Sequence, residues 1–202
     1  MFNKARVGLQ ERSGMIMAQA QVGDDIFGEP LWLALTILLI AAATILGALG
    51  FEHIGGYQPC ALCLMQRTPY YVGVPLAAAT ALAAWRGGSR TVLTVLFALL
   101  GALMLYSLGL AVYHAGVEWR FWEGPDSCAP SVSVGSAADM LNQLETTTAP
   151  SCTDAVWRFL GLSFAGWNVL VSALLAGLGF YAAALSRRRG NPQGSRTASQ
   201  YR

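Results

Sequence analysis

Four long stretches without a formal charge constrain the fold of this chain more than any other feature. They are 22, 18, 27 and 28 residues long and cover residues 30–51, 68–85, 91–117 and 159–186. An α-helix rises about 1.5 Å per residue, so about 20 residues cross the roughly 30 Å hydrocarbon core of a membrane. The stretches are too long and unbroken for barrel strands of alternating hydrophobicity. The sequence therefore predicts an all-α membrane protein with a four-transmembrane-helix bundle.

The composition agrees with a membrane protein. Of the 202 residues, 54% are hydrophobic and 12% are charged, whereas soluble proteins average about 45–50% and about 25%. The net charge of +2 excludes a protein that binds nucleic acid through a basic field. We expect a monomer with one transmembrane domain at residues 31–186, flanked by an N-terminal tail at 1–30 and a basic tail at 187–202. The predicted helices span residues 31–51, 66–86, 91–113 and 163–186.

The distribution of Lys and Arg predicts the orientation in the membrane. Ten of these side chains lie in the two tails and the 86–90 loop, and only Arg67, Arg120 and Arg158 lie on the other side. Because basic residues accumulate on the cytoplasmic side, both termini should be cytoplasmic and the loops at 52–65 and 114–162 periplasmic. The first apolar run is too long for a signal peptide, so we expect an uncleaved helix. The six tryptophans fall near predicted helix ends, as an interfacial belt requires.

All four cysteines lie on the predicted outward side, where disulfides persist: Cys60, Cys63, Cys128 and Cys152. A Cys128–Cys152 disulfide would close a loop of about 25 residues and stabilise it by roughly 3–4 kcal/mol. A disulfide between Cys60 and Cys63 would close a much smaller ring and add little stability through loop entropy. C-x-x-C is instead the spacing of redox pairs and zinc knuckles. Zinc needs four ligands, and the second pair is too widely spaced for a knuckle. We favour a redox pair without metal, with structural disulfides and zinc as alternatives.

The residues around the C-x-x-C pair favour a reactive thiolate. If the second helix begins near Cys63, the amides of its first turn stabilise an anion there. Arg67 follows at the i+4 position, on the same helix face as Cys63. Both effects lower the pKa of a thiol. The alternative role of Arg67 is to extend its side chain to the membrane interface.

Residues 59–67, PCALCLMQR, resemble the P-C-x-L-C-x-x-x-R signature of the DsbB family. These are bacterial inner-membrane quinone reductases that reoxidise the periplasmic disulfide donor DsbA. The resemblance extends to the four helices, the two outward loops with a cysteine pair in each, and the WRFLGLS run at 157–163. It implies a membrane oxidoreductase of the bacterial inner membrane, with a DsbA-like thiol oxidase as partner and ubiquinone or menaquinone as electron acceptor.

The resemblance also implies a role for each cysteine. Cys128 would form the mixed disulfide with the partner, and Cys152 would exchange with Cys60. Cys63 would then be the thiolate that faces the quinone, with Arg67 beside the quinone oxygens.

Family members carry a polar residue after the third helix, often a histidine with a glutamine four residues on. His114 matches the histidine, and the chain departs from the pattern in having Glu118 where the glutamine stands. His114 is a candidate quinone-binding or proton-delivering residue, or an interfacial histidine without a task. Glu118 is either a proton relay or a solvated side chain, and we do not include it among the candidate site residues.

The second periplasmic loop contains a predicted amphipathic segment. Residues 136–145 combine a capping box with an apolar stripe, which predicts a short helix on the membrane surface within a mobile loop.

Two rival functions of the protein remain as alternatives to the quinone reductase. One is a dedicated sulfur relay of the DsbI type, and the other is a non-catalytic tetraspan scaffold with structural disulfides.

Overall fold

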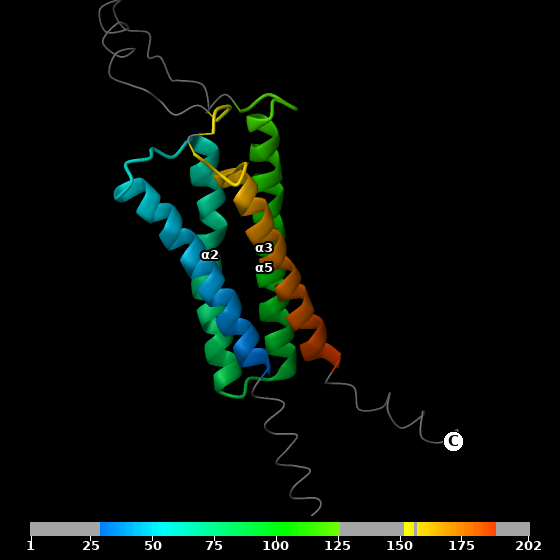
Figure 1. The fold of residues 1–202 in the computed structure, drawn as a ribbon. Helices are drawn as coiled ribbons and strands as arrows, with labels where there is room; N and C mark the ends of the chain where they lie inside the picture. The colour runs from blue at the N-terminus through cyan, green and yellow to red at the C-terminus, as the bar shows by residue number, and fades with distance from the viewer. Residues whose placement is uncertain (1–28, 126–151, 156, 189–202) are drawn as a thin grey trace, which may run out of the picture.

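The protein forms a bundle of helices, seen in a computed structural model that describes residues 29–125, 152–155 and 157–188. The first helix spans Glu29–His53 and is followed by α2 (Ala61–Trp85), α3 (Arg90–Glu118) and α5 (Phe164–Arg188). The helices lie side by side (Figure 1). Residues 1–28 and 189–202 of the predicted tails, the predicted surface helix at 136–145 and Cys128 lie outside the described residues.

Three helices in the described part of the chain are long and apolar enough to cross a membrane: Glu29–His53, α3 and α5. This bears out a multi-pass helical membrane protein. Helix α2 is as long as the first helix, but it carries Gln66, Arg67 and Thr80, and two prolines interrupt its sequence. The four-span topology therefore stays a prediction.

Two helix boundaries differ from the prediction in ways that matter for the site. Helix α2 begins at Ala61 rather than near residue 66, because the sulfur of Cys60 accepts a hydrogen bond from the Cys63 amide and caps the helix. Helix α3 continues to Glu118 rather than ending near residue 113. It ends where Arg120 adopts a positive φ of 60°. The extension places His114 inside the helix instead of in the long loop.

A short hairpin precedes α5 and is the one departure from an all-α fold among the described residues. Strands β1 (Arg158–Phe159) and β2 (Leu162–Ser163) pair antiparallel. The turn between them uses positive φ at Leu160 and Gly161 (53° and 82°), as two-residue hairpin turns require. The hairpin lies at the end of the bundle where α2 begins (Figure 1).

Close approach of α3 and α5 holds the bundle core together. These two helices make the most extensive contact of the labelled elements, and Phe97, Leu100 and Leu175 are fully buried in the core. A Cβ on Gly179 would lie 2.7 Å from the backbone nitrogen of Gly101. The helices can approach this closely only because position 179 lacks a side chain.

We therefore expect Gly179→Ala to destabilise the protein by about 1–3 kcal/mol, since the methyl group pushes α3 and α5 apart. Gly177→Ala is the matched control on the same helix, because no atom lies within 4 Å of its added Cβ. Thermal unfolding in detergent measures both. A Gly179→Ala protein as stable as the Gly177→Ala protein would contradict the close-packing account.

Candidate active site

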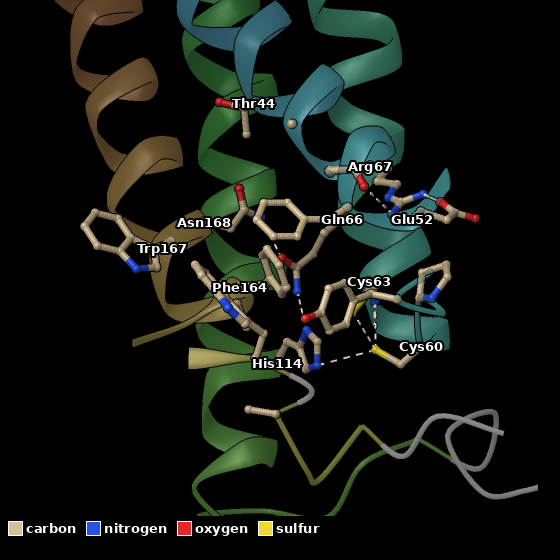
Figure 2. Close-up of a pocket in the computed structure, with 18 of the residues that line it drawn as sticks. Thr44, Glu52, Cys60, Cys63, Gln66, Arg67, His114, Phe164, Trp167 and Asn168 are labelled. Atoms are coloured by element: carbon tan, nitrogen blue, oxygen red, sulfur yellow. Dashed lines mark hydrogen bonds and ion pairs between the residues drawn. The ribbon is translucent and has the colours of Figure 1, made fainter. Parts of the chain in front are cut away.

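A cavity of about 480 Å³ lies where the first helix, α2, α3 and α5 meet. Thr44 and Phe51 of the first helix and Val171 of α5 contribute to its walls. Cys60, Cys63, Arg67 and His114 also line it, and Figure 2 shows these four side chains near one another. Four of the six site residues predicted from the sequence thus lie on the wall of this cavity.

Cys60 and Cys63 are placed to form a disulfide. Both sulfurs are free, and they lie 2.8 Å apart. A disulfide bond is about 2.05 Å long, so a small movement closes the pair. Cys60 is buried and Cys63 is half-buried, and both line the cavity. The pair can therefore exchange two electrons with a molecule in the cavity.

Cys60, rather than Cys63, occupies the position at which the helix amides stabilise an anion. The expectation for Cys63 assumed a later helix start. Because α2 begins at Ala61, the Cys63 amide instead donates to the Cys60 sulfur over 3.2 Å. Hydrogen bonding to the Cys63 thiol, and secondarily to His114, lowers the pKa of the Cys60 thiol, although burial opposes the shift. In the reduced pair, Cys60 is therefore the favoured thiolate.

Cys152 is buried beside the C-x-x-C pair. It belongs to one apolar cluster with Cys60, Leu62 and Val117, against which Cys63 packs. Cys152 is disulfide-bonded. The cluster thus joins a residue of the second outward segment to the first sulfur of the redox pair.

Arg67 lines the cavity but is tied to the first helix. Its guanidinium donates a hydrogen bond to the Glu52 carboxylate and another, of 3.4 Å, to the Ala48 carbonyl oxygen. Both bonds tie α2 to the C-terminal end of the first helix, and Figure 2 shows Arg67 beside Glu52. A bound molecule would meet a guanidinium already oriented by Glu52, rather than one paired with the Cys63 sulfur.

His114 is a core residue of the site. Its side chain is 2% exposed, and its two ring nitrogens face Gln66 and Cys60 at 2.6 and 3.6 Å. The ligand atoms of Cys60, Cys63 and His114 lie within 4.8 Å of one another, so this trio could hold a metal ion. The Glu118 carboxylate lies 3.8 Å from His114 Nε2.

Several residues of the cavity were not predicted from the sequence. The sequence predicted Glu52 as the first residue of a loop. It predicted Gln66, Tyr70 and Asn168 as parts of apolar helices without a role in the site. Their signal was present, since amide side chains within membrane helices are costly unless they have partners. Trp157 and Trp167, which were assigned to the interfacial belt, also line the cavity. The rings of Phe51 and Phe164 line the cavity as well. The centroid of the Trp157 ring lies 5.3 Å from that of Phe51 and 5.0 Å from that of Phe164.

The fold and the site together define the class: a helical membrane protein that carries a redox-type cysteine pair beside an internal cavity. Comparison with known proteins then identifies the family. The family model for the disulfide bond formation protein DsbB matches residues 30–182. The chain belongs to the DsbB family, which makes it a membrane disulfide oxidoreductase.

The curated relatives carry the same family name. Disulfide bond formation protein B of Marinobacter nauticus is 31% identical over 157 residues, which cover 74% of this chain and 89% of that protein. The proteins of this name from Aromatoleum aromaticum and Azoarcus sp. are 31% and 30% identical. Their alignments cover 71% and 73% of this chain, and 87% and 89% of the relatives. No solved structure matches the chain significantly.

Proposed function

We propose that this protein reoxidises a periplasmic thiol oxidase similar to DsbA and passes the electrons to a membrane quinone, ubiquinone or menaquinone. The observation that carries the proposal is the position of the Cys60–Cys63 pair on the wall of an internal cavity between apolar helices. The name of the relatives, disulfide bond formation protein B, supports the same reaction.

The cavity suits a quinone in size and in lining. Its volume of about 480 Å³ is within the range of about 300–1,000 Å³ usual for small-molecule sites. Phe51, Trp157 and Phe164 offer aromatic faces for a flat ring, and the Arg67 guanidinium offers hydrogen-bond donors for a quinone oxygen. The walls include Thr44 of the first helix and Val171 of α5, and a hydrocarbon tail would lie against these two apolar helices.

The thiol chemistry proceeds by two exchanges. The dithiol of the partner attacks the Cys128–Cys152 disulfide at Cys128, and the partner leaves as a disulfide while Cys128 and Cys152 become thiols. Cys152 then attacks the Cys60–Cys63 disulfide at Cys60 and releases Cys63 as a thiolate. Attack by Cys128 on the Cys60–Cys152 bond restores the second disulfide and leaves Cys60 and Cys63 reduced. The burial of Cys152 beside Cys60 supports this order.

The electrons then leave the reduced pair. Cys60 and Cys63 lose two electrons and two protons as their sulfur–sulfur bond forms, and a quinone accepts both to become a quinol. The chain supplies position and electrostatics. Helix α2 holds the Cys60 thiolate in contact with the Cys63 thiol, and Glu52 orients Arg67.

This function requires the redox loops to face the periplasm and both termini to face the cytoplasm, in the bacterial inner membrane. The excess of Lys and Arg in the tails and in the 86–90 loop supports that orientation. The start of α2, which Cys60 caps, and the hairpin that precedes α5 lie at the same end of the bundle, opposite the turn between α2 and α3 (Figure 1).

Trapping the partner on a Cys152→Ser variant tests the proposed function. Without Cys152, the Cys128 thiolate can attack the disulfide of the oxidised partner, which forms a mixed disulfide and releases the partner's second cysteine as a thiolate. Only that second cysteine can then resolve the bond, so acid quenching and alkylation of cells should capture a DsbA-like oxidase on Cys128. The matched control replaces both Cys128 and Cys152 by serine and should trap nothing. Recovery of one dedicated enzyme would instead indicate the relay function. Absence of any mixed disulfide, with cysteines inert to mild dithiols, would indicate the scaffold.

A further inference from the structure

A chain of hydrogen bonds crosses the bundle and ends at the Cys60 sulfur. The Tyr70 hydroxyl donates to Asn168 Oδ1 over 2.7 Å, and Asn168 Nδ2 donates to Gln66 Oε1 over 2.6 Å. Gln66 Nε2 lies 2.6 Å from His114 Nδ1, and His114 Nε2 lies 3.6 Å from Cys60 Sγ. The chain therefore links α5, α2 and α3 to the redox pair (Figure 2).

The direction of donation along this chain determines where the imidazole hydrogen lies. Asn168 Oδ1 accepts from Tyr70 and, over 3.2 Å, from Ser172, so the Asn168 amide nitrogen faces Gln66. Gln66 Oε1 accepts a hydrogen bond from the Asn168 amide nitrogen, so the Gln66 amide nitrogen faces His114. An amide nitrogen only donates, so His114 Nδ1 must accept. The ring hydrogen is then on Nε2.

The groups around His114 Nε2 agree with this assignment. Its neighbours are the Cys60 sulfur at 3.6 Å, on the α2 side, and a Glu118 carboxylate oxygen at 3.8 Å, on α3 itself. Ser163, next to α5, donates to the other Glu118 oxygen. A thiolate and a carboxylate both accept hydrogen bonds. A donor at Nε2 therefore suits both neighbours, whereas a lone pair there would face two acceptors.

The chain is largely buried, with Asn168 half-buried, so its two amides can turn over only together and not one at a time. Gln66, Tyr70, His114 and Ser172 are all buried, and no buried side-chain nitrogen or oxygen among the described residues lacks a partner. Reversing one amide alone would set two donors or two acceptors against each other, at a cost of about 1–3 kcal/mol for each group left unsatisfied.

We propose that Gln66 and Asn168 are positioning residues that hold His114 in a single tautomer, with its hydrogen on Nε2 directed at the Cys60 sulfur. Neither residue contacts the sulfur, and both act through the imidazole. The fixed donor stabilises a thiolate at Cys60 and disfavours a role of His114 Nε2 as a base towards that sulfur. The inference deepens the proposed function because it takes Cys60 as a redox sulfur, but both tests below are made without quinone or partner.

Nitrogen NMR of the reduced, ¹⁵N-histidine-labelled full-length protein tests the tautomer directly. The chain has only two histidines, and the other, His53, is exposed and serves as an internal reference. We expect His114 to show the Nε2–H tautomer. The Asn168→Asp variant should convert His114 to the Nδ1–H tautomer, because a carboxylate cannot donate to Gln66 and the Gln66 amide must turn over. A wild-type His114 with its hydrogen on Nδ1, or on both nitrogens, would overturn the proposal.

The thiolate titration provides the second readout. It uses ultraviolet thiolate absorbance in a background with Cys128→Ser and Cys152→Ser, so that only Cys60 and Cys63 contribute. In the reduced pair the Cys60 thiolate should persist below the ordinary thiol range near pH 8.5. Gln66→Leu removes the donor to His114 and should raise the midpoint by about one pH unit.

A matched variant separates this effect from general damage to the helix. Thr80→Val also removes a buried polar atom from α2, where the Thr80 hydroxyl donates to the Leu76 carbonyl of the same helix. It should leave the midpoint and the His114 tautomer unchanged. Equal midpoints in the wild-type, Gln66→Leu and Asn168→Asp proteins would overturn the positioning role, whatever the outcome of the quinone assays.

Discussion

Replacing either Cys60 or Cys63 by serine is expected to abolish the reduction of quinone by the partner dithiol. The two sulfurs lie 2.8 Å apart, and each is needed for the bond that releases the electron pair. A serine oxygen cannot form that bond, so turnover should fall by about a thousandfold or more, as when a nucleophile is removed. The loss of quinone absorbance in a mixture of protein, reduced partner and quinone measures the rate.

The control for this experiment is Thr80→Val, which alters the interior of α2 away from the cavity and should keep full turnover. Measurable quinone reduction by Cys60→Ser or Cys63→Ser protein would contradict the assignment of the redox pair. An inert wild-type protein, with disulfides that resist mild dithiols, would support the scaffold instead.

Replacing Arg67 by alanine is expected to weaken the use of quinone while the fold is retained. The guanidinium lines the cavity and is oriented by Glu52, and a hydrogen bond from a charged donor contributes about 1.5–3 kcal/mol. The KM for quinone should therefore rise by roughly tenfold to a hundredfold. Steady-state assays at varied quinone concentration, with the reduced partner in excess, measure the change.

Two further variants separate the contribution of Arg67 to binding from its charge. Arg86→Ala removes an exposed arginine at the opposite end of α2 and should leave KM unchanged. Arg67→Lys keeps the charge but loses the planar fork that bonds both Glu52 and Ala48, so its KM should fall between wild type and Arg67→Ala. An Arg67→Ala protein with wild-type KM and rate would remove Arg67 from the quinone site.

The positions of the helices were largely predictable because uncharged length alone decides which segments are apolar enough for a membrane. Helix ends were less predictable, since local capping determines them. The spacing of charges does not indicate that the Cys60 sulfur accepts a hydrogen bond from the Cys63 amide and caps the helix. The start of α2 was therefore predicted several residues too late. For the same reason His114 was assigned to a loop, whereas it lies buried within α3.

The candidate site was predictable where one short motif contains it. Cys60, Cys63 and Arg67 lie within eight residues of one another, and all three line the cavity. The partners that orient the site come from distant segments: Glu52 from the first helix and Asn168 from α5. Such pairings depend on how the helices pack, which a single sequence does not specify.

A single-turnover experiment tests the central claim most directly. Reduced protein that retains only Cys60 and Cys63, through Cys128→Ser and Cys152→Ser, is mixed without oxygen with one equivalent of ubiquinone or menaquinone. The account predicts that one quinol forms for each protein molecule with at least one of the two quinones, and that a Cys60–Cys63 disulfide appears at the same rate. A pair that stays reduced while both quinones remain unchanged would contradict it.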